Sequence, residues 1–303
     1  MSTSAWHQWR AELAIALVAF IWGATFVVVK SALADASTLI FLSLRFGLAA
    51  ILLLGMFRLQ SGSLHNFSRY WRGGLLCGFF LFVGYALQTA GLRTTAASKS
   101  AFLTGLFVVL VPILSSVLKR RAPRPIECAG AVLAVGGTAL LTLEPAAGFR
   151  LSNGDLLTIG CAFAFSAHML AVERFSSTRG HQSLTLWQVL SVGAFSAAGC
   201  WWIETPRLAI SGRLVSALII TALLATAVSF ALYTWAQSRT TASRASLIFA
   251  LEPVFAALTA WFWSREAWSF RTLAGSALIL GAILLVEMKP SFPQTHPQKQ
   301  MDA

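Results

Sequence analysis

Residues 86–112 read ALQTAGLRTTAASKSAFLTGLFVVLVP, and residues 231–253 read ALYTWAQSRTTASRASLIFALEP. Both stretches open with Ala-Leu-x-Thr, continue through Thr-Thr-Ala and close with L-x-x-x-L-x-P, at offsets of 141 to 146 residues. Gly130 and Gly136 match Gly275 and Gly281 within the same range of offsets. The pattern predicts an internal repeat in which each unit takes up about half of the chain.

The composition identifies the solvent that most of the surface faces. Of 303 residues, 57% are apolar and only 11% are charged, and the mean hydropathy is +0.71. Soluble chains carry about one quarter charged residues because their surface faces water. The sequence therefore predicts a polytopic membrane protein.

Ten apolar runs, each near the length that a bilayer requires, are bounded by charges and turn residues. They lie at about 13–33, 38–57, 72–92, 98–118, 126–143, 155–173, 184–203, 214–237, 243–263 and 269–288. Each repeat unit holds five of them, so the second unit enters the membrane from the opposite side. We expect an all-α fold with ten transmembrane helices, built as two inverted five-helix repeats. The repeats cover residues 1–146 and 147–290, and residues 291–303 form a disordered cytoplasmic tail.

Basic residues fall unevenly on the two sides of these spans. The side that carries both termini has fourteen Lys and Arg residues, and the other side has eight. Arg45 is left out of this count because it lies inside a span. Positive residues are retained on the cytoplasmic side, so both termini are expected to be cytoplasmic, in the inner (plasma) membrane. The first run is too long for a signal-peptide core and ends in Lys30, which predicts a retained span.

The net charge of +12 does not indicate a nucleic-acid-binding protein, because the basic residues form short clusters between apolar runs. The four cysteines are scattered through apolar runs without C-x-x-C spacing, so neither a disulfide framework nor a metal site is expected. No cofactor is expected. The expected partners are a small-molecule substrate, the lipid bilayer and protons, and the protein is either a monomer or a homodimer.

Several motifs resemble those of the drug/metabolite transporter superfamily, specifically its EamA-type members. AFIWGATF at residues 19–26 followed by Lys30, Leu44-Arg45-Phe46, and ALEPVFAAL at residues 250–258 followed by Glu266 match the family at its spacing. The likeness runs from about residue 13 to 287, but Lys119-Arg120-Arg121 stand where first-half members often carry an acidic residue. The resemblance implies a central cavity between two halves and outward movement of small metabolites, often amino acids.

Glu252 is the strongest candidate for function, because ionisable groups inside a membrane are costly. It directly precedes Pro253, whose ring clashes with the carbonyl of Phe249 and whose nitrogen carries no hydrogen. The carboxyl either takes part in coupling beside this freed carbonyl or pairs with an arginine such as Arg45. Pro112 is the repeat counterpart of Pro253, and mirrored breaks point either to a site between the repeats or to tolerated kinks.

The remaining candidates are aromatic or polar groups inside the spans. Arg45 either binds a substrate carboxylate, snorkels to the outer headgroups or forms an ion pair. His168 is either a proton relay or a hydrogen-bonded interior residue. The full candidate set for substrate binding and coupling is Trp22, Arg45, Tyr85, Gln88, Thr89, Pro112, His168, Tyr233, Glu252 and Pro253.

These features predict a secondary transporter of small amphipathic metabolites that works by alternating access. A passive channel or uniporter is the alternative. An integral-membrane enzyme is disfavoured, because the sequence contains no H-E-x-x-H, no G-x-S-x-G and no P-loop. His168 and Glu173 are five residues apart on a helix, so their side chains diverge.

Overall fold

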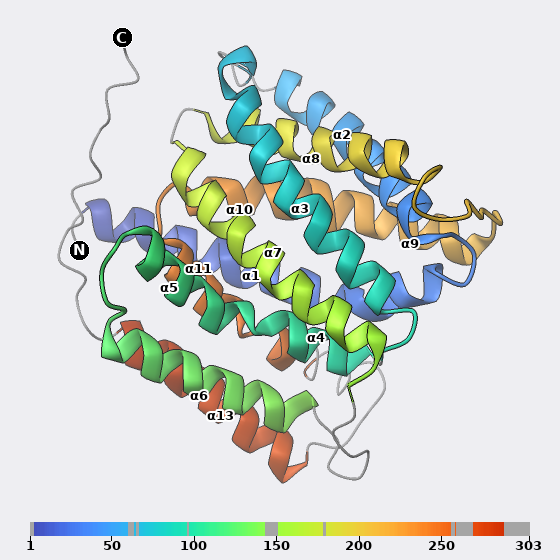
Figure 1. Ribbon diagram of the computed structural model, residues 1–303. Helices are drawn as coiled ribbons and strands as arrows, with labels where there is room; N and C mark the ends of the chain where they lie inside the picture. Colours follow the sequence, from blue (N-terminus) through green and yellow to red (C-terminus); the bar gives the residue numbers. More distant parts are fainter. Residues whose placement is uncertain are drawn as a thin grey trace.

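The computed structural model describes residues 3–59, 64, 67–95, 97–142, 151–177, 180–255, 258 and 269–287. Glu266, the repeat boundary at 146/147 and the tail at 291–303 lie outside these residues. Throughout the described ranges the regular structure is helical and contains no strand, so the all-α prediction is confirmed (Figure 1).

Helices fall in each of the ten apolar ranges. The first half contains α1 (Thr3–Ala32), α2 (Thr38–Leu59), the 3₁₀ turn η1 (Phe67–Tyr70), α3 (Trp71–Gly91), α4 (Ala97–Gly105), α5 (Phe107–Leu118) and α6 (Pro125–Thr142). The second half contains α7 (Asn153–Phe175), α8 (His181–Gly199), α9 (Gly212–Ala222), the π-helical turn η3 (Leu223–Val228), α10 (Ser229–Gln237), α11 (Ala242–Phe249) and α13 (Phe270–Glu287).

Within the described residues, six helical stretches are long and apolar enough to cross a bilayer. They are Gln8–Ala32, Thr38–Leu59, Phe67–Gly91, Lys99–Leu118, Asn153–Phe175 and Gly212–Gln237, and shorter apolar helices run over Pro125–Leu140 and Phe270–Leu285. Large apolar side chains such as Leu17, Val27 and Ile51 lie exposed on the outside of these helices. Apolar helices with apolar outer surfaces are suited to lipid, and the chain is a multi-pass membrane protein.

Small residues bring some of these helices into close contact. A Cβ atom on Gly74 of α3 would lie 2.1 Å from the Cβ of Trp187 on α8, and one on Gly78 would lie 2.4 Å from that of Ser191. Gly137 of α6 packs in the same way against the backbone of Gly275 on α13, where the added Cβ would lie 2.6 Å from a carbonyl oxygen. Small residues at these contacts let helix backbones approach, and Figure 1 shows α6 and α13 side by side.

Three of the predicted spans are not continuous α-helices. The range 98–118 is divided at Leu106 into α4 and α5, and the range 214–237 contains the π-helical turn η3 between α9 and α10. A third interruption follows α11, where the amides of Ala250 and Leu251 bond to carbonyls three residues back rather than four. These irregular turns lie next to the central chamber described below.

Candidate functional site

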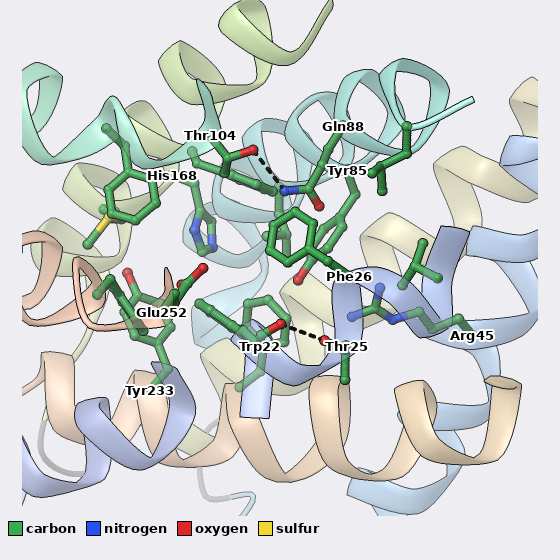
Figure 2. A pocket seen from close by; sticks show the side chains of 18 residues that line it. Trp22, Thr25, Phe26, Arg45, Tyr85, Gln88, Thr104, His168, Tyr233 and Glu252 are labelled. Carbon is green, nitrogen blue, oxygen red and sulfur yellow. Dashed lines mark hydrogen bonds between the residues drawn. The ribbon is translucent and has the colours of Figure 1, made fainter. Parts of the chain in front are cut away.

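A chamber lies in the middle of the bundle, lined by helices from both halves (Figure 2). Its wall is mostly aromatic and aliphatic, with a few polar side chains. The lining residues are Trp22, Thr25, Phe26, Val29, Arg45, Leu81, Tyr85, Gln88, Leu92, Thr104, Phe107, Phe165, His168, Met169, Phe230, Tyr233, Phe249 and Glu252. An apolar cavity with a few inward polar groups is typical of a small-molecule site.

Most of the candidates from the sequence meet in this chamber. Trp22, Arg45, Tyr85, Gln88, His168, Tyr233 and Glu252 all line it. Thr89 and Pro253 are buried in the helices behind the wall and are not part of the lining.

Pro112 does not reach the chamber. It lies inside α5 and lines a separate, more polar pocket with Ser115, Ser116, Arg121, Ala122, Arg124, Glu127 and Ser243. The first-half break falls at Leu106, six residues before the proline, so the helix has resumed when it reaches Pro112. The two prolines therefore do not occupy equivalent places.

Glu252 stands at the break in its own span. The helix α11 ends at Phe249, the backbone tightens at residues 250–251, and helical structure resumes at Glu252. The carboxyl group is buried in the protein and lines the chamber, and among the described residues it has no hydrogen-bond or ion-pair partner. It is therefore available to a ligand.

Arg45 neither snorkels nor pairs with Glu252. Its side chain is only 3% exposed, and no ion pair joins it to a carboxylate in the part of the chain that is described. Its Nε donates to Thr226 Oγ1 at 2.8 Å, and its Nη2 to the carbonyl of Ala225 at 3.4 Å. Thus neutral acceptors on η3 hold the guanidinium inside the bundle, 4.8 Å from the ring centre of Tyr85.

Trp22 is the centre of the aromatic wall. Its ring is stacked on Phe249 at a centroid distance of 5.0 Å and lies 5.5 Å from the ring of Phe230. The indole N–H donates to the Ala225 carbonyl at 2.9 Å. A tryptophan of the first half is therefore fixed by backbone and rings of the second half, and it presents a flat surface to the chamber.

His168 and Gln88 have protein partners. His168 Nε2 lies 2.8 Å from Gln188 Oε1, and the amide of Gln188 donates to Thr234 Oγ1 at 3.0 Å. The amide of Gln88 donates to Thr104 Oγ1 at 3.2 Å. Glu173 lies elsewhere and bonds Lys119 at 3.0 Å, so it forms no constellation with His168.

The lining also contains residues that were not among the sequence candidates. Applying the repeat offset of 143 to Trp22, Thr25 and Phe26 gives Phe165, His168 and Met169, and an offset of 145 takes Tyr85 to Phe230 and Gln88 to Tyr233. All ten residues line the chamber. The internal repeat is the sequence signal by which Phe165, Met169 and Phe230 could have been identified as lining residues.

Two ion pairs lie beyond opposite ends of the chamber. Lys99 at the start of α4 binds Asp155 at the start of α7, with 2.7 Å between Nζ and Oδ2. Arg244 at the start of α11 binds Glu12 of α1, with 3.3 Å between Nη1 and Oε1. These residues correspond through the repeat, at offsets of 145 for the cations and 143 for the carboxylates.

The length of helix α1 gives the approximate distance between the two ion pairs. Glu12 belongs to one pair, whereas Lys30 donates to the carbonyl of Thr95, whose hydroxyl bonds Asp155 of the other pair. Eighteen residues of α-helix rise about 27 Å, close to the thickness of a hydrocarbon core. Trp22 lies between the two ends, so the chamber is near mid-depth.

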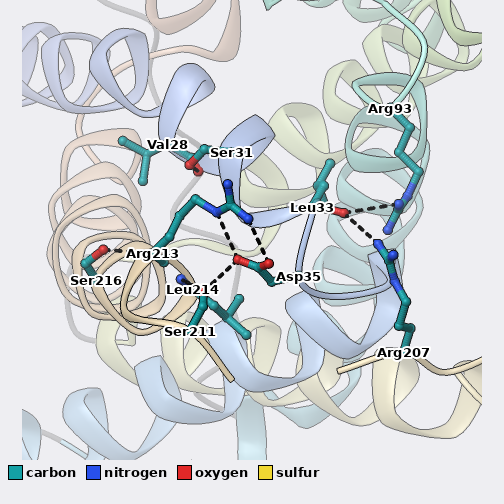
Figure 3. Close-up of polar contacts among 10 residues, drawn as sticks. All are labelled: Val28, Ser31, Leu33, Asp35, Arg93, Arg207, Ser211, Arg213, Leu214 and Ser216. Atoms are coloured by element: carbon teal, nitrogen blue, oxygen red, sulfur yellow. Dashed lines mark hydrogen bonds and ion pairs between the residues drawn. The ribbon is translucent and has the colours of Figure 1, made fainter. Parts of the chain in front are cut away.

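A further polar contact joins loops of the two halves at the Lys30 end of α1 (Figure 3). Residues 33–37 run beside residues 204–211 with an isolated antiparallel bridge between Ala36 and Leu208, and we call this contact the loop clasp. Asp35 accepts from Arg213 at 2.8 and 2.9 Å and from Ser211 at 2.6 Å. These hydrogen bonds lower the pKa of Asp35 to about 2.

Among the described residues no cluster of three or more His, Cys, Asp or Glu side chains has a geometry that would hold a metal ion. The four cysteines are free thiols. The chemistry of the chamber is therefore that of one arginine, one carboxyl, one imidazole, neutral hydrogen-bonding groups and aromatic rings.

Comparison with known proteins gives one consistent result. The EamA-like transporter family matches residues 9–143 and again residues 152–288. A protein of Archaeoglobus fulgidus named an uncharacterized transporter is 33% identical over 281 residues, covering 92% of this chain and 86% of its own. The uncharacterized transporter YoaV of Bacillus subtilis is 22% identical over 285 residues, covering 91% and 96%.

A crystal structure with 20% identity and a TM-score of 0.74 covers 91% of this chain and 96% of its own, so the fold is one already seen. Two matches to a single transporter family take up nearly the whole chain, and relatives named as transporters cover more than 90% of it. The chain belongs to the EamA-like transporter family.

Proposed function

We propose that the protein is a secondary transporter that moves small zwitterionic metabolites, amino acids or related amphipathic compounds, outward across the inner membrane by alternating access. It has ten spans in two inverted repeats and both termini in the cytoplasm. The observation that carries this proposal is the chamber near mid-depth, lined by repeat-related residues from both halves and placed between two repeat-related ion pairs.

The packing of the helices supports the inverted repeat. The contact of α3 with α7 has a counterpart in the contact of α1 with α10, and that of α4 with α7 has one in α1 with α11. Equivalent helices such as α2 and α8, or α6 and α13, pack directly on each other. This is the arrangement expected of two units related by a two-fold axis.

The ion pairs provide the two gates of the mechanism. Lys99–Asp155 closes the outer end of the chamber and Arg244–Glu12 closes the inner end. Lys99–Asp155 joins α4 to α7, and Arg244–Glu12 joins the repeat counterparts of these helices, α11 and α1. Opening one gate while the other stays closed would therefore give an outward-facing state and an inward-facing state with similar packing, in which the two halves have exchanged positions. The loop clasp adds a further link at the outer end.

The polar and aromatic groups of the chamber favour an amphipathic substrate that carries a carboxylate. Figure 2 places Arg45 and Glu252 far apart across the chamber, with Trp22, Phe26 and Tyr85 between them. A guanidinium is suited to the carboxylate of an amino acid, and the rings to its apolar side chain. The ammonium group shares a carbon with that carboxylate, so Glu252 on the far side of the chamber is left to bind a proton. We expect amino acids with apolar or aromatic side chains to bind best.

Glu252 is the coupling residue of this proposal, because it is the carboxyl group that lines the chamber. Carboxyl groups inside membrane proteins serve as proton carriers in pumps and transporters. Glu252 would be protonated in alternation with the binding of substrate elsewhere in the chamber, and an inward proton would drive an outward substrate.

The test is substrate flux into liposomes with and without a pH gradient, for the wild type, Glu252→Gln and the control Glu127→Gln, whose carboxyl lies outside the chamber. We expect the first variant to lose gradient-driven flux and the control to keep it. Full gradient-driven flux in Glu252→Gln would refute the coupling role.

A flux measurement in the same vesicles distinguishes a carrier from a passive channel. A carrier gives saturable counterflow of a labelled amino acid, whereas a channel gives a flux that rises linearly with concentration. The closed ion pairs at both ends and the aromatic wall favour the carrier.

A further inference from the structure

The π-helical turn η3 contacts two chamber residues of the first half at once. The carbonyl of Ala225 accepts hydrogen bonds from both the Trp22 indole N–H and Arg45 Nη2. Thr226 Oγ1 accepts a hydrogen bond from Arg45 Nε. The Thr226 hydroxyl in turn donates to the carbonyl of Thr221, five residues back, at 2.8 Å. Single π turns inside α-helices often occur at functional sites.

This turn is not a consequence of the duplicated fold. The repeat counterpart of Thr226 at an offset of 145 is Leu81, which lies in the uninterrupted helix α3. Only the second-half helix is widened at this level, at the place where it receives Arg45. The irregularity therefore belongs to the site around the arginine.

Arg45 is a buried cation that lacks an anion within the described part of the protein. Its neighbours are the Thr226 hydroxyl, the Ala225 carbonyl and the rings of Tyr85 and Phe46, at 4.8 and 5.3 Å from the guanidinium carbon. A guanidinium has five N–H groups; the Thr226 hydroxyl and the Ala225 carbonyl use two of them and the Tyr85 hydroxyl also interacts with the guanidinium, so at least two remain. A buried charge without a counter-ion is unstable, so a ligand anion in the chamber would be stabilised there.

We propose that Arg45 is the carboxylate-binding group of the chamber and that Thr226 is its positioning residue. This inference rests on the proposed function and adds the group that selects the substrate. The Thr226 hydroxyl fixes Nε on the side of η3, so the unused N–H groups of the guanidinium remain for the ligand. A carboxylate bound by two parallel hydrogen bonds requires that fixed orientation.

The rival interpretation is structural, in which Arg45 only joins α2 to η3. The two interpretations differ in what the loss of the Thr226 hydroxyl does to ligands with and without a carboxylate. L-Phenylalanine and phenethylamine form a suitable pair of probes, because they differ only in that group.

The experiment measures the concentration of each probe that half-saturates transport in liposomes for the wild type, Thr226→Val, Thr226→Ser and Ser229→Ala. Ser229 is the matched control, because its hydroxyl bonds Leu224 in the same turn and its contacts do not include Arg45. We expect Thr226→Val to raise the half-saturating concentration of phenylalanine about tenfold and that of phenethylamine less than twofold, because a hydrogen bond to a charged group is lost. Thr226→Ser and Ser229→Ala should resemble the wild type. Equal changes for both probes, or none, would overturn the inference.

A second measurement needs no variant. Phenylglyoxal modifies arginine, and mass spectrometry of the peptide that contains Arg45 reports its extent in the purified protein. We expect 3-phenylpropionate to slow this modification and phenethylamine to leave it unchanged. Lack of protection by the carboxylate overturns the inference even where transport is found, whereas protection without transport of any amino acid overturns the proposed function alone.

Discussion

His168 shows how a single side chain in the chamber is held. Its ring nitrogen bonds the Gln188 amide oxygen, and that amide continues to the Thr234 hydroxyl, so three buried polar groups satisfy one another. Its ring also lies 6.0 Å from that of Tyr233. The geometry is that of an interior residue with a fixed partner, whereas Glu252 has no such partner among the described residues.

We therefore expect His168→Gln to keep gradient-driven flux within about threefold of the wild type, because the new amide donates to Gln188. His168→Leu leaves the buried Gln188 oxygen unpaired, which costs about 1–3 kcal/mol, and should lower the melting temperature in detergent by several degrees. Loss of gradient-driven flux in His168→Gln, with counterflow retained, would make His168 a proton relay after all.

The chamber residues that the sequence revealed were those whose chemistry is unusual inside a membrane. Arg45, His168 and Glu252 stand out because charge and titratable groups are rare there, and Trp22 because it lies away from the span ends. Phe165 and Phe230 have no such property, since phenylalanine occurs in nine of the ten predicted spans. Only their relation to Trp22 and Tyr85 through the repeat distinguishes them, and the neutral partners of Arg45 on η3 depend on tertiary contacts that no local pattern encodes.

At the scale of elements, the spans could be predicted from apolar length, but their interruptions could not. The break at Leu106 and the π turn at Leu223–Val228 lie inside predominantly apolar runs, so the mean hydropathy of the runs gives no sign of them. The glycine pattern was partly informative. Gly74 and Gly78 do allow α3 to approach α8, whereas Gly136 and Gly281, which repeat in the sequence, face open space.

This difference gives a paired prediction for helix packing. Gly78→Ala places a methyl group against Ser191 and the carbonyl of Gln188, and we expect a loss of about 1–3 kcal/mol of stability through overpacking. Gly136→Ala meets nothing within 4 Å and should be neutral or slightly stabilising, since alanine favours helix. Thermal unfolding of the two variants in detergent measures the difference. Equal melting temperatures would contradict this account of the contact of α3 with α8.

The loop clasp gives a prediction that depends on pH. Because the folded pKa of Asp35 lies at about 2, below its ordinary value of 3.8, its ion pair stabilises the fold above pH 4. That contribution is lost as the pH falls toward 2. We expect Asp35→Asn to have a lower melting temperature than the wild type at pH 7 and this difference to close in acid. Ser216→Ala, whose hydroxyl donates to the Arg213 carbonyl, should show no difference from the wild type at either pH. A gap that does not vary with pH would rule out the charge as its cause.

At the scale of the whole molecule, two copies of one unit share a chamber that neither encloses alone. The duplication could be predicted because offsets in the sequence are nearly constant. The correspondence of the two ion pairs could not, because Lys99 and Arg244 differ in type, as do Asp155 and Glu12, and their pairing joins distant helices. The structure was needed to show that each cation meets a carboxylate at the related place.

We expect the two pairs to control access from opposite sides. A cysteine at Phe26 in a background without Cys77, Cys128, Cys161 and Cys200 reports on the chamber through an impermeant thiol reagent. Asp155→Asn should raise labelling from outside and Glu12→Gln from inside, each about fivefold, the effect of about 1 kcal/mol on a two-state balance. Thr272→Ala, on α13 and outside both pairs, is the control. Increased labelling from the same side in both variants would refute opposed gates.

The two carboxylates are not equally well held. Asp155 accepts from Lys99, from the Thr95 hydroxyl and from the Ser152 amide, at 2.7 to 3.0 Å, whereas Glu12 accepts from Gln8 at 3.0 Å and from Arg244 at 3.3 Å. The better-held pair should release less often. An empty carrier would then spend most of its resting time facing the cytoplasm, so the cargo waiting there would be the first to load.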